Sequence, residues 1–348
     1  MRTLAIAVAG AGAMGRQHMA LVRAHPACEL AAIVDTAPSA GALAAAAGVP
    51  LHDSLARLFA ARRPDAVILA TPNAAHVPQA LECIAAGVPA LIEKPVADTV
   101  RAGIRLCDAA ERTGVRLLVG HHRRHSAIIA SAVAVVQSGA LGDLVAVTGS
   151  ALFYKPDAYF DEGPWRRQPG GGPLLINMIH DIASLRALCG EIVAVQALAS
   201  NARRRFAVED TVSIGLRFAC GALGTFVLSD TAAAAQSWEQ TSGENPVYAR
   251  YPDEDCYVVA GTRGSLGIPT LRLRAFGDGM ERSWRTPMAT HVLDVPQADP
   301  LVRQLDHFCA VVRGEAAPLV TVRDALQNVR VVEAIGEAAR TGRTVATG

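Results

Sequence analysis

The chain has 348 residues, of which 51% are hydrophobic, so it carries enough apolar material for two domain cores. Its 33 basic and 32 acidic residues give a net charge of +1, which provides no general attraction to nucleic acid or to an anionic membrane surface. We therefore expect no nucleic acid and no membrane as partners, and any recognition by charge must be local.

The seven cysteines are scattered along the chain, and none belongs to a C-x-x-C pair. This pattern disfavours both a disulfide framework and a zinc site, and it favours a cytoplasmic location. The opening stretch MRTLAIAVAGAGA resembles a secretory signal in composition, but its apolar run is short and leads directly into a glycine-punctuated helix. No stretch approaches the roughly 18 uninterrupted apolar residues that a spanning helix needs, so we expect a soluble protein.

Residues 1–122 alternate short apolar runs with helical segments. Such runs are typical of strands buried on both faces, and their spacing leaves room for the crossover helices of a parallel sheet. One of the helices, 77–86, stops at Gly87, where a left-handed cap is favourable. The sequence therefore predicts an α/β fold with a doubly wound Rossmann domain over 1–122. Its expected strands are 3–9, 30–35, 66–71, 90–93 and 116–120.

After residue 140 the pattern changes to apolar residues at every second position, which indicates an antiparallel sheet with one covered face. A helix near 174–189 precedes this sheet, and helices near 299–313 and 322–341 close the chain. We expect a substrate-binding α+β domain over 123–348, with the last helices packing back towards the first domain. An open sheet would leave an apolar face bare, so we also expect a homo-oligomer, either a dimer or a tetramer. The strands predicted here are 211–218, 222–228, 256–260 and 270–276.

The first strand runs into Gly10-Ala11-Gly12-Ala13-Met14-Gly15 and then a helix, which is the context that gives a G-x-G-x-x-G motif its meaning. The first glycine permits a tight turn, the second lets the backbone approach a pyrophosphate, and the third allows close helix packing. Asp35 ends the next strand, where a carboxylate can bind both ribose hydroxyls of NAD. Because that carboxylate would repel a 2′-phosphate and residues 36–38 contain no arginine, the sequence favours NAD over NADP.

The run Glu93-Lys94-Pro95, which follows a predicted strand, resembles the E-K-P motif of the Gfo/Idh/MocA oxidoreductases. In that family the second domain is an open, largely antiparallel sheet used for subunit contacts, in agreement with the pattern read above. The resemblance also covers Thr71-Pro72-Asn73 with His76, Lys155-Pro156 to Tyr159-Phe160, Trp165-Arg166, Gly170-Gly171-Gly172, His180-Asp181 and the helix that contains Gln304 to Phe308.

One departure from the family pattern concerns the segment before His180. Members typically carry G-G-G-x-L-x-D-x-G-x-H, but here Ile176 stands at the aspartate position and Met178 at the following glycine. Asn177 lies beside the missing acid and Asp181 follows the histidine, so the sequence leaves open which of them, if either, takes over its role.

These features predict an NAD-dependent dehydrogenase that transfers a hydride to or from a hydroxyl-bearing carbon of a small polyol, sugar acid or cyclic diol. An ammonium at Lys94, at the end of a parallel strand, can polarise the substrate oxygen, and His180 is the expected acid/base because imidazole exchanges protons near neutrality. Asn177, three residues before His180, can orient the histidine or the substrate.

The expected cofactor contacts beyond the glycine motif and Asp35 are Thr71, Pro72, Asn73, His76, Glu93 and Lys94. The expected substrate contacts are Arg123, Arg124, Lys155, Trp165, Arg166, Asn177 and His180. Because arginine and lysine suit carboxylate binding, an anionic substrate fits this set.

His121, His122 and His125 raise the question of a metal site, but no carboxylate or cysteine lies near them in sequence and two adjacent arginines would repel a cation. We therefore expect no metal. Two alternatives to a dehydrogenase stay open: a hydrolase or lyase in which bound NAD is reduced and regenerated within the cycle, and a non-catalytic regulator that responds to NAD.

Overall fold

The computed structural model describes residues 2–348, which divide into two compact units. Unit 1 extends to His122 and also includes Leu301–Val329, whereas unit 2 comprises Arg123–Pro300 and Arg330–Gly348. Within the described residues, no helix combines the length and the apolar character needed to cross a membrane.

Unit 1 contains a six-stranded parallel sheet in the order β3-β2-β1-β4-β5-β6. Every residue of β1, β4, β5 and β6 is buried, as expected for strands covered on both faces. The strand order reverses between β1 and β4, and ligands bind beside such a reversal at the carboxyl edge of the sheet. The strands are β1 (Leu4–Ala9), β2 (Cys28–Val34), β3 (Leu51–His52), β4 (Ala66–Leu69), β5 (Ala90–Glu93) and β6 (Leu117–Gly120).

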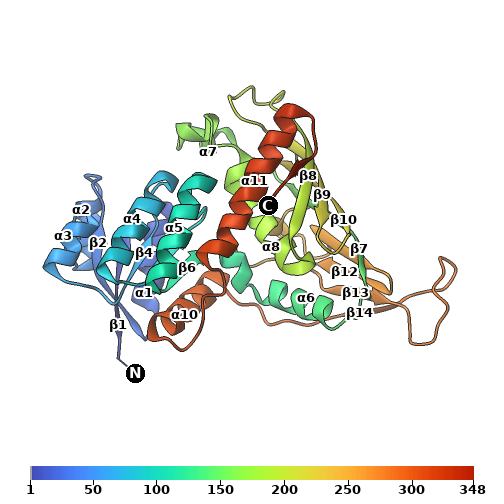
Figure 1. Cartoon of the computed structure of the whole chain (residues 1–348), viewed down its shortest axis with the longest axis horizontal. Coiled ribbons are helices and arrows are strands. Elements are labelled where there is room, and N and C mark those ends of the chain that lie inside the picture. The colour runs from blue at the N-terminus through green and yellow to red at the C-terminus, as the bar shows by residue number, and fades with distance from the viewer. Residues whose placement is uncertain (1) are drawn as a thin grey trace. The chain divides into compact units, whose positions relative to one another are not determined.

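Helices cover both faces of this sheet. Residues of α1, α2 and α10 join one apolar cluster with Ile6, Ile33 and Ile68 of the strands, while α3, α4 and α5 lie side by side (Figure 1). Gly87 caps α4 in the left-handed conformation, which confirms that part of the prediction. The helices are α1 (Ala13–Ala24), α2 (Ala40–Ala47), α3 (Leu55–Ala61), α4 (Asn73–Ala86), α5 (Val100–Thr113), α10 (Pro300–Arg313) and α11 (Val322–Thr341), of which α11 continues into unit 2.

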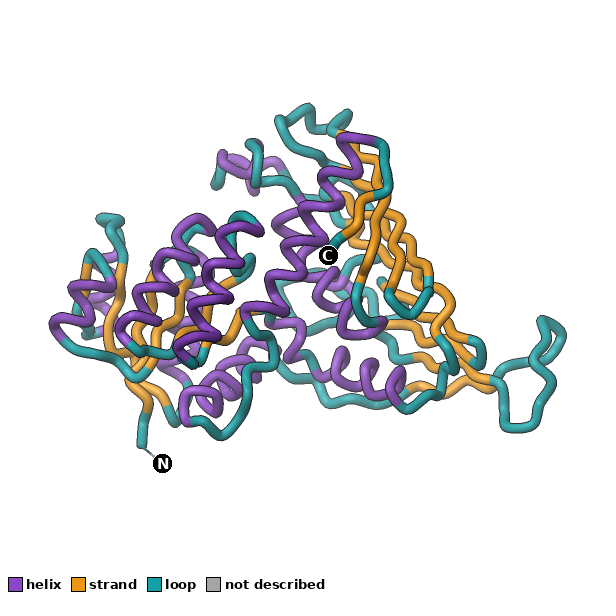
Figure 2. The backbone as a smooth tube through the Cα atoms, viewed as in Figure 1, coloured by secondary structure: helices purple, strands orange, loops and turns teal. Residues whose placement is uncertain are grey.

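Unit 2 is built on a nine-stranded sheet in the order β14-β13-β12-β11-β7-β10-β9-β8-β15. The pairing of β7 with β10 is parallel, and the other pairings are antiparallel. A loop over residues 276–288 extends from the β13–β14 end of the sheet (Figure 2). The strands are β7 (Leu144–Leu152), β8 (Ile192–Ser200), β9 (Thr211–Phe218), β10 (Leu223–Ser229), β11 (Tyr257–Gly261), β12 (Gly264–Ile268), β13 (Arg272–Ala275), β14 (Ala289–Val292) and β15 (Val345–Ala346).

The helical part of unit 2 differs from the prediction in one place that matters for function. The expected helix over 174–189 is two elements, because its first turn is a π-helix, η3 (Leu174–Met178), that leads into α8 (Ile179–Cys189). A single π turn often marks a functional position. The remaining helical elements are η1 (His122–His125), α6 (Ala127–Gln137), α7 (Asp157–Asp161), η2 (Pro164–Arg167) and α9 (Trp238–Thr241).

The fold class predicted from the sequence is confirmed: a parallel Rossmann sheet is joined to a mixed, mostly antiparallel second sheet. The strands β3, β7, β8, β12, β14 and β15 were not among the predicted elements. In the two long ones, β7 and β8, exposure does not alternate regularly along the chain, so the period-two signal is weak there.

Candidate active site

The glycine motif forms the turn between β1 and α1. Gly10 has a φ of +95°, and a Cβ atom there would lie 2.4 Å from the carbonyl oxygen of Ala70. A Cβ at Gly15 would lie 1.8 Å from the carbonyl oxygen of Gly10, so α1 can begin directly against the end of β1 only because both positions are glycines. No atom lies within 4 Å of a Cβ placed on Gly12, which leaves the backbone open to a bound group.

This turn fits a dinucleotide. The N-terminus of α1 presents unpaired backbone N–H groups beside the open position at Gly12, and such a terminus stabilises phosphate charge. Asp35 follows β2 and is half-buried; its two carboxylate oxygens accept hydrogen bonds from the backbone N–H groups of Ala11 (2.5 Å) and Ala37 (2.7 Å). The carboxylate is thereby held next to the turn, with oxygen lone pairs remaining for ribose hydroxyls.

The loops after β4 and β5 are tied together by His76. Its Nε2 lies 2.8 Å from the carbonyl oxygen of Thr71, and its Nδ1 lies 2.8 Å from that of Pro95. The ring is 1% exposed, so His76 connects two loops inside the protein rather than presenting a polar edge. Pro72 is the N-cap residue of α4 and Asn73 its first residue, so both stand at the same carboxyl edge of the sheet as the glycine turn.

Glu93, the last residue of β5, is a buried anchor for the loop that carries Lys94. One carboxylate oxygen lies 2.8 Å from Nε2 of His18 on α1, and the other accepts the backbone N–H of Lys94 at 3.3 Å. Burial raises the pKa of Glu93, but the hydrogen bond and charge of His18, with Lys94 and His122, outweigh burial and lower the pKa to about 2. The carboxylate therefore stays ionised and fixes the start of the Lys94 loop. Lys94 itself is partly buried.

A pocket of about 650 Å³ lies within unit 2. Aromatic and alanine side chains make up much of its wall, and the polar groups are Lys155, Asn177, Glu239 and Gln240. Its residues are Phe153, Tyr154, Lys155, Pro156, Tyr159, Asn177, Ala233, Ala234, Ala235, Glu239, Gln240, Tyr248, Ala249 and Tyr251. The volume suits a small ligand, and an apolar wall with a few polar groups is the usual composition of a ligand site.

Lys155 is the cation of this pocket. Its Nζ donates to Oδ1 of Asn177 at 2.7 Å, lies 3.9 Å from Asp230 and sits 4.9 Å from the ring centroid of Tyr159. Burial lowers the pKa of Lys155 to about 8, although the charges of Asp230 and Glu239 oppose this shift. Lysine occurs twice in the chain, as Lys94 and Lys155, so both lysines belong to predicted site positions.

Asn177 and Asp181 have different surroundings, which bears on the departure from the family pattern. Asn177 lies in η3 and lines the pocket with Lys155. Asp181 is 1% exposed and accepts hydrogen bonds from Arg123 at 2.8 Å and from Tyr257. Burial raises the pKa of Asp181 to about 6, against the effect of Arg123. Of the two residues, Asn177 is the one with access to a ligand in the pocket, and His180 lies between them on α8.

The expected substrate contact at Arg123 needs correction. Its guanidinium is buried and donates to Asp181 at 2.8 Å and to Glu239 at 2.6 Å, while Trp238 covers it at 5.7 Å. Removing a buried arginine from two carboxylates to bind a substrate would leave those carboxylates without compensation. Arg123 is thus part of the internal framework behind Asp181, and sequence spacing alone could not show this.

The other expected arginine and tryptophan positions lie outside the pocket lining. Arg166 stacks on Tyr159, with its guanidinium carbon 3.8 Å from the ring centroid, and it also donates to the Tyr159 carbonyl. Trp165 is 55% exposed, and Arg124 is half-buried in η1. Sequence reasoning missed Glu239, Gln240 and Tyr248, which reach the pocket from segments without a motif.

Comparison with known proteins gives matches to family models over most of the chain. Residues 4–121 match a model described as an oxidoreductase family with an NAD-binding Rossmann fold. Residues 129–267 match the GFO/IDH/MocA C-terminal domain.

Individual relatives agree with these matches. The rhizopine catabolism protein MocA of Rhizobium meliloti is 28% identical over 194 residues, which are 55% of this chain and 59% of that protein. The 1,5-anhydro-D-fructose reductase of Ensifer adhaerens is 27% identical over 284 residues, covering 80% of this chain and 78% of that enzyme. The crystal structure of the WlbA dehydrogenase of Bordetella pertussis, in complex with NADH and UDP-GlcNAcA, has a TM-score of 0.80 and 26% identity, covering 100% of this chain and 99% of that one.

We expect Glu93→Gln to make the free energy of unfolding less dependent on pH in the acid range. A folded-state pKa of about 2 against a usual value of 4.5 corresponds to roughly 3 kcal/mol of stability. Because the folded-state pKa is depressed, this stability is fully present above about pH 4.5 and is lost as the pH falls towards 2. Urea unfolding should therefore show a large deficit of the variant at pH 7 that shrinks at pH 3.5.

Glu82 in α4 is exposed, so Glu82→Gln is the matched control for removing a carboxylate from unit 1. That variant should follow the wild type at both pH values. A deficit of Glu93→Gln that is equal at pH 7 and pH 3.5 would contradict the assignment of an ionised, stabilising carboxylate.

Proposed function

The chain belongs to the Gfo/Idh/MocA family of oxidoreductases with an NAD-binding Rossmann domain, and we propose that it is a dehydrogenase for a small hydroxylated, carboxylated substrate such as a sugar acid. The comparisons confirm three predictions made from the sequence: the family, the oxidoreductase class and NAD as the cofactor. The observation that carries the proposed substrate class is the hydrogen bond of the buried Lys155 to the half-buried Asn177 in the pocket of unit 2.

The proposed chemistry combines hydride transfer by the cofactor with proton transfer by side chains of the protein. When bound, NAD accepts a hydride from the carbinol carbon or returns one to a carbonyl. We propose that Lys94 holds the substrate oxygen and that His180 takes or gives its proton. The buried Glu93 supports this role, because its carboxylate fixes the backbone N–H of Lys94. Lys94 directly follows β5 and is partly buried, so its backbone belongs to the carboxyl edge of the sheet, as the glycine turn does, which supports this proposal.

We propose that Lys155 and Asn177 bind the carboxylate and a hydroxyl of the substrate. An ammonium in a pocket of low polarity attracts a carboxylate more strongly than an exposed one does. Asn177 brings both a donor and an acceptor to the position next to the family's missing aspartate. With an amide there, the neutral side chain leaves the charge of Lys155 available for an anion, which favours an acidic substrate over a neutral polyol.

We expect Lys94→Met to lower kcat by a factor on the order of 10² to 10⁴ while NAD affinity stays close to that of the wild type. A panel of sugar acids, inositols and cyclic diols, followed by NADH absorbance, identifies the substrate for this measurement. Calorimetric titration with NAD provides the control for cofactor binding. Turnover near the wild-type rate with cofactor bound would remove Lys94 from the mechanism.

The same assay separates the dehydrogenase from the two alternatives. Substrate-dependent accumulation of NADH supports net oxidation, whereas turnover with tightly held cofactor and no accumulation indicates a hydrolase or lyase that regenerates NAD. Absence of any turnover across the panel, with NAD bound, favours a regulator.

Because the chain has two lysines, the titration of Lys155 can be followed directly by NMR. In protein labelled with ¹³C at the lysine Cε, the chain gives two lysine signals, and we expect the Lys155 signal to titrate with a pKa of about 8. Because the amine is charged below that pH and neutral above it, KM for a carboxylated substrate should rise as the pH passes 8, by up to roughly tenfold per pH unit. Asn177→Asp adds a carboxylate 2.7 Å from Nζ and should move both transitions to higher pH.

Lys155→Arg serves as the control that keeps the positive charge throughout this range, and its KM should show no such rise. A KM that is independent of pH between 7 and 9 in the wild type, or an Asn177→Asp variant with an unshifted profile, would contradict carboxylate binding by Lys155.

We also propose that the chain forms a homo-oligomer through the outer face of its nine-stranded sheet. Leu223 and Val227 of β10 lie on this face with exposed fractions of 58% and 38%, and Val258 of β11 is 38% exposed. The register aligns Thr225 of β10 with Thr148 of β7, and Thr148 with Val258. Apolar groups in such an open face favour contact with a second copy.

Sedimentation velocity at micromolar concentration should show an oligomer for the wild type and a smaller species for Val227→Glu. Val247 is 85% exposed and lies outside the sheet, so Val247→Glu is a matched control that should sediment as the wild type does. A wild-type monomer would contradict this proposal.

We propose a cytoplasmic location, as the scattered cysteines predict. The seven cysteines are all free thiols in the structure, which suits a reducing compartment. Fractionation of the cells that produce the protein tests this, and recovery from a secreted fraction would contradict it.

A further inference from the structure

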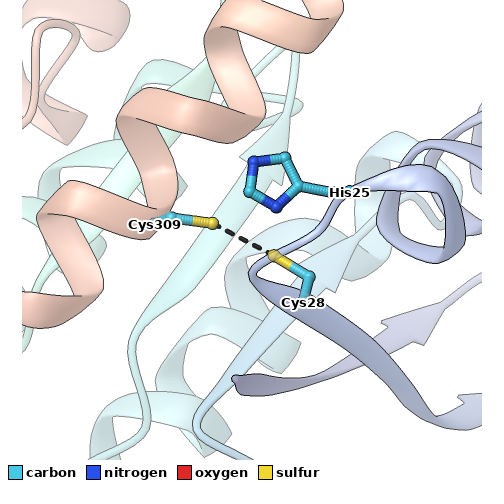
Figure 3. Close-up of side chains that lie close together, drawn as sticks. All are labelled: His25, Cys28 and Cys309. Atoms are coloured by element: carbon cyan, nitrogen blue, oxygen red, sulfur yellow. Dashed lines mark hydrogen bonds between the residues drawn. The ribbon is translucent and has the colours of Figure 1, made fainter. Parts of the chain in front are cut away.

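Three side chains with metal-ligand chemistry meet in unit 1, far from the glycine turn. Cys28 is the first residue of β2, His25 lies between α1 and β2, and Cys309 belongs to α10 (Figure 3). Their ligand atoms all lie within 4.8 Å of one another, and the two sulfur atoms are 3.2 Å apart. Because β2 runs from this cluster towards the carboxyl edge, the cluster stands at the opposite edge of the sheet from the dinucleotide turn.

We propose that His25, Cys28 and Cys309 bind a zinc ion. Two thiolates and one imidazole are the ligands that zinc prefers, and such sets take the metal in tetrahedral geometry with the fourth position filled by water or a carboxylate. Hard cations such as Mg²⁺ and Ca²⁺ require oxygen ligands, so this set does not suit them. The site is independent of the proposed dehydrogenase chemistry.

The hydrogen bonds of His25 support this assignment. Its Nε2 lies 2.9 Å from Oδ1 of Asp306, one turn before Cys309 on α10, so the ring donates its proton to a carboxylate. Nδ1 is then the unprotonated nitrogen. Its lone pair accepts the backbone N–H of Ala27 at 3.1 Å, a hydrogen bond that a metal ion would replace. A histidine whose other nitrogen is bound to a carboxylate is the usual arrangement at zinc sites, because the carboxylate fixes the tautomer and orients the ring.

A disulfide between the two cysteines is the main competing interpretation. Tetrahedral zinc with Zn–S bonds of about 2.3 Å separates its sulfur ligands by roughly 3.7 Å, whereas a disulfide brings them to about 2.0 Å. From the observed 3.2 Å, zinc requires the smaller movement. A disulfide also gives no role to the His25–Asp306 pair, which a metal site explains.

The surroundings of the cluster give an ion access from solvent, and a bound ion would stabilise unit 1. Cys28 and Cys309 are 8% and 2% exposed, within the same apolar cluster as Leu305 and Phe308 of α10. The Asp306 side chain is 58% exposed, so the polar side of the cluster opens to solvent. Since the ligands come from both β2 and α10, a bound ion would connect α10 to the start of the second strand and stabilise unit 1.

The test uses full-length, reduced protein without a polyhistidine tag. We expect it to bind one Co²⁺ ion with the visible absorption of a tetrahedral site and the near-ultraviolet charge-transfer band of thiolate ligands, and to release it when Zn²⁺ is added. Zinc should raise the melting temperature. Asp306→Asn changes an exposed side chain and should weaken zinc binding by about tenfold, because it removes the carboxylate behind His25.

Cys309→Ser should abolish the charge-transfer band, whereas Cys83→Ser, which changes a buried thiol on α4 outside the cluster, should retain it. Circular dichroism and NAD binding establish that each variant is folded. The proposal is overturned if the wild type gives no cobalt spectrum, if the spectrum persists in folded Cys28→Ser and Cys309→Ser, or if hydrogen peroxide joins the two cysteines at the same rate with and without excess zinc.

Discussion

The close approach of the glycine turn to the end of β4 is the constraint on which the dinucleotide site depends. A side chain at Gly10 would collide with the carbonyl of Ala70, and one at Gly15 would collide with the carbonyl of Gly10. With hydrogen atoms there, β1, β4 and α1 converge, and the helix terminus faces the carboxyl edge of the sheet. Asp35 after β2 accepts the backbone N–H of Ala11, and Glu93 at the end of β5 accepts the backbone N–H of Lys94. Two acids at the carboxyl ends of different strands thus fix backbone positions at this edge of the sheet.

Two buried cations of unit 2, Arg123 and Lys155, differ in how their charge is compensated. In unit 2, the buried Arg123 is enclosed by Asp181 and Glu239, which makes it a structural cation. Lys155 is also buried, but its nearest acidic oxygen is 3.9 Å away and its close partner is the neutral Asn177. A cation with incomplete compensation in a pocket has charge left for a ligand. This contrast is the physical basis for the proposal that Lys155, rather than an arginine, binds a carboxylate of the substrate.

The elements that could be predicted from the sequence are those with a regular apolar pattern or a short, specific motif. Strands such as β1 and β4 were found because they are apolar at every position, and the glycine turn because its spacing is short and specific. The partners of Arg123 were not predictable, since Asp181 and Glu239 lie 58 and 116 residues away from it. The π turn at Asn177 was missed because apolar periodicity does not distinguish it from an α-helix. Cys28 and Cys309 are 281 residues apart, and a search for C-x-x-C pairs cannot detect such a cluster. The roles of Lys94 and His180 stay predictions.

Calorimetric titration of Gly12→Val with NAD tests the central claim most directly, because Gly12 is open space in the fold and approaches only the cofactor in the proposed site. Gly41 in α2 is also open and provides the matched variant Gly41→Val. We expect Gly12→Val to lose NAD affinity by at least about tenfold while its melting temperature stays close to that of Gly41→Val, which should bind NAD as the wild type does. Unchanged NAD affinity in a folded Gly12→Val protein would contradict the assignment of this turn as the pyrophosphate site.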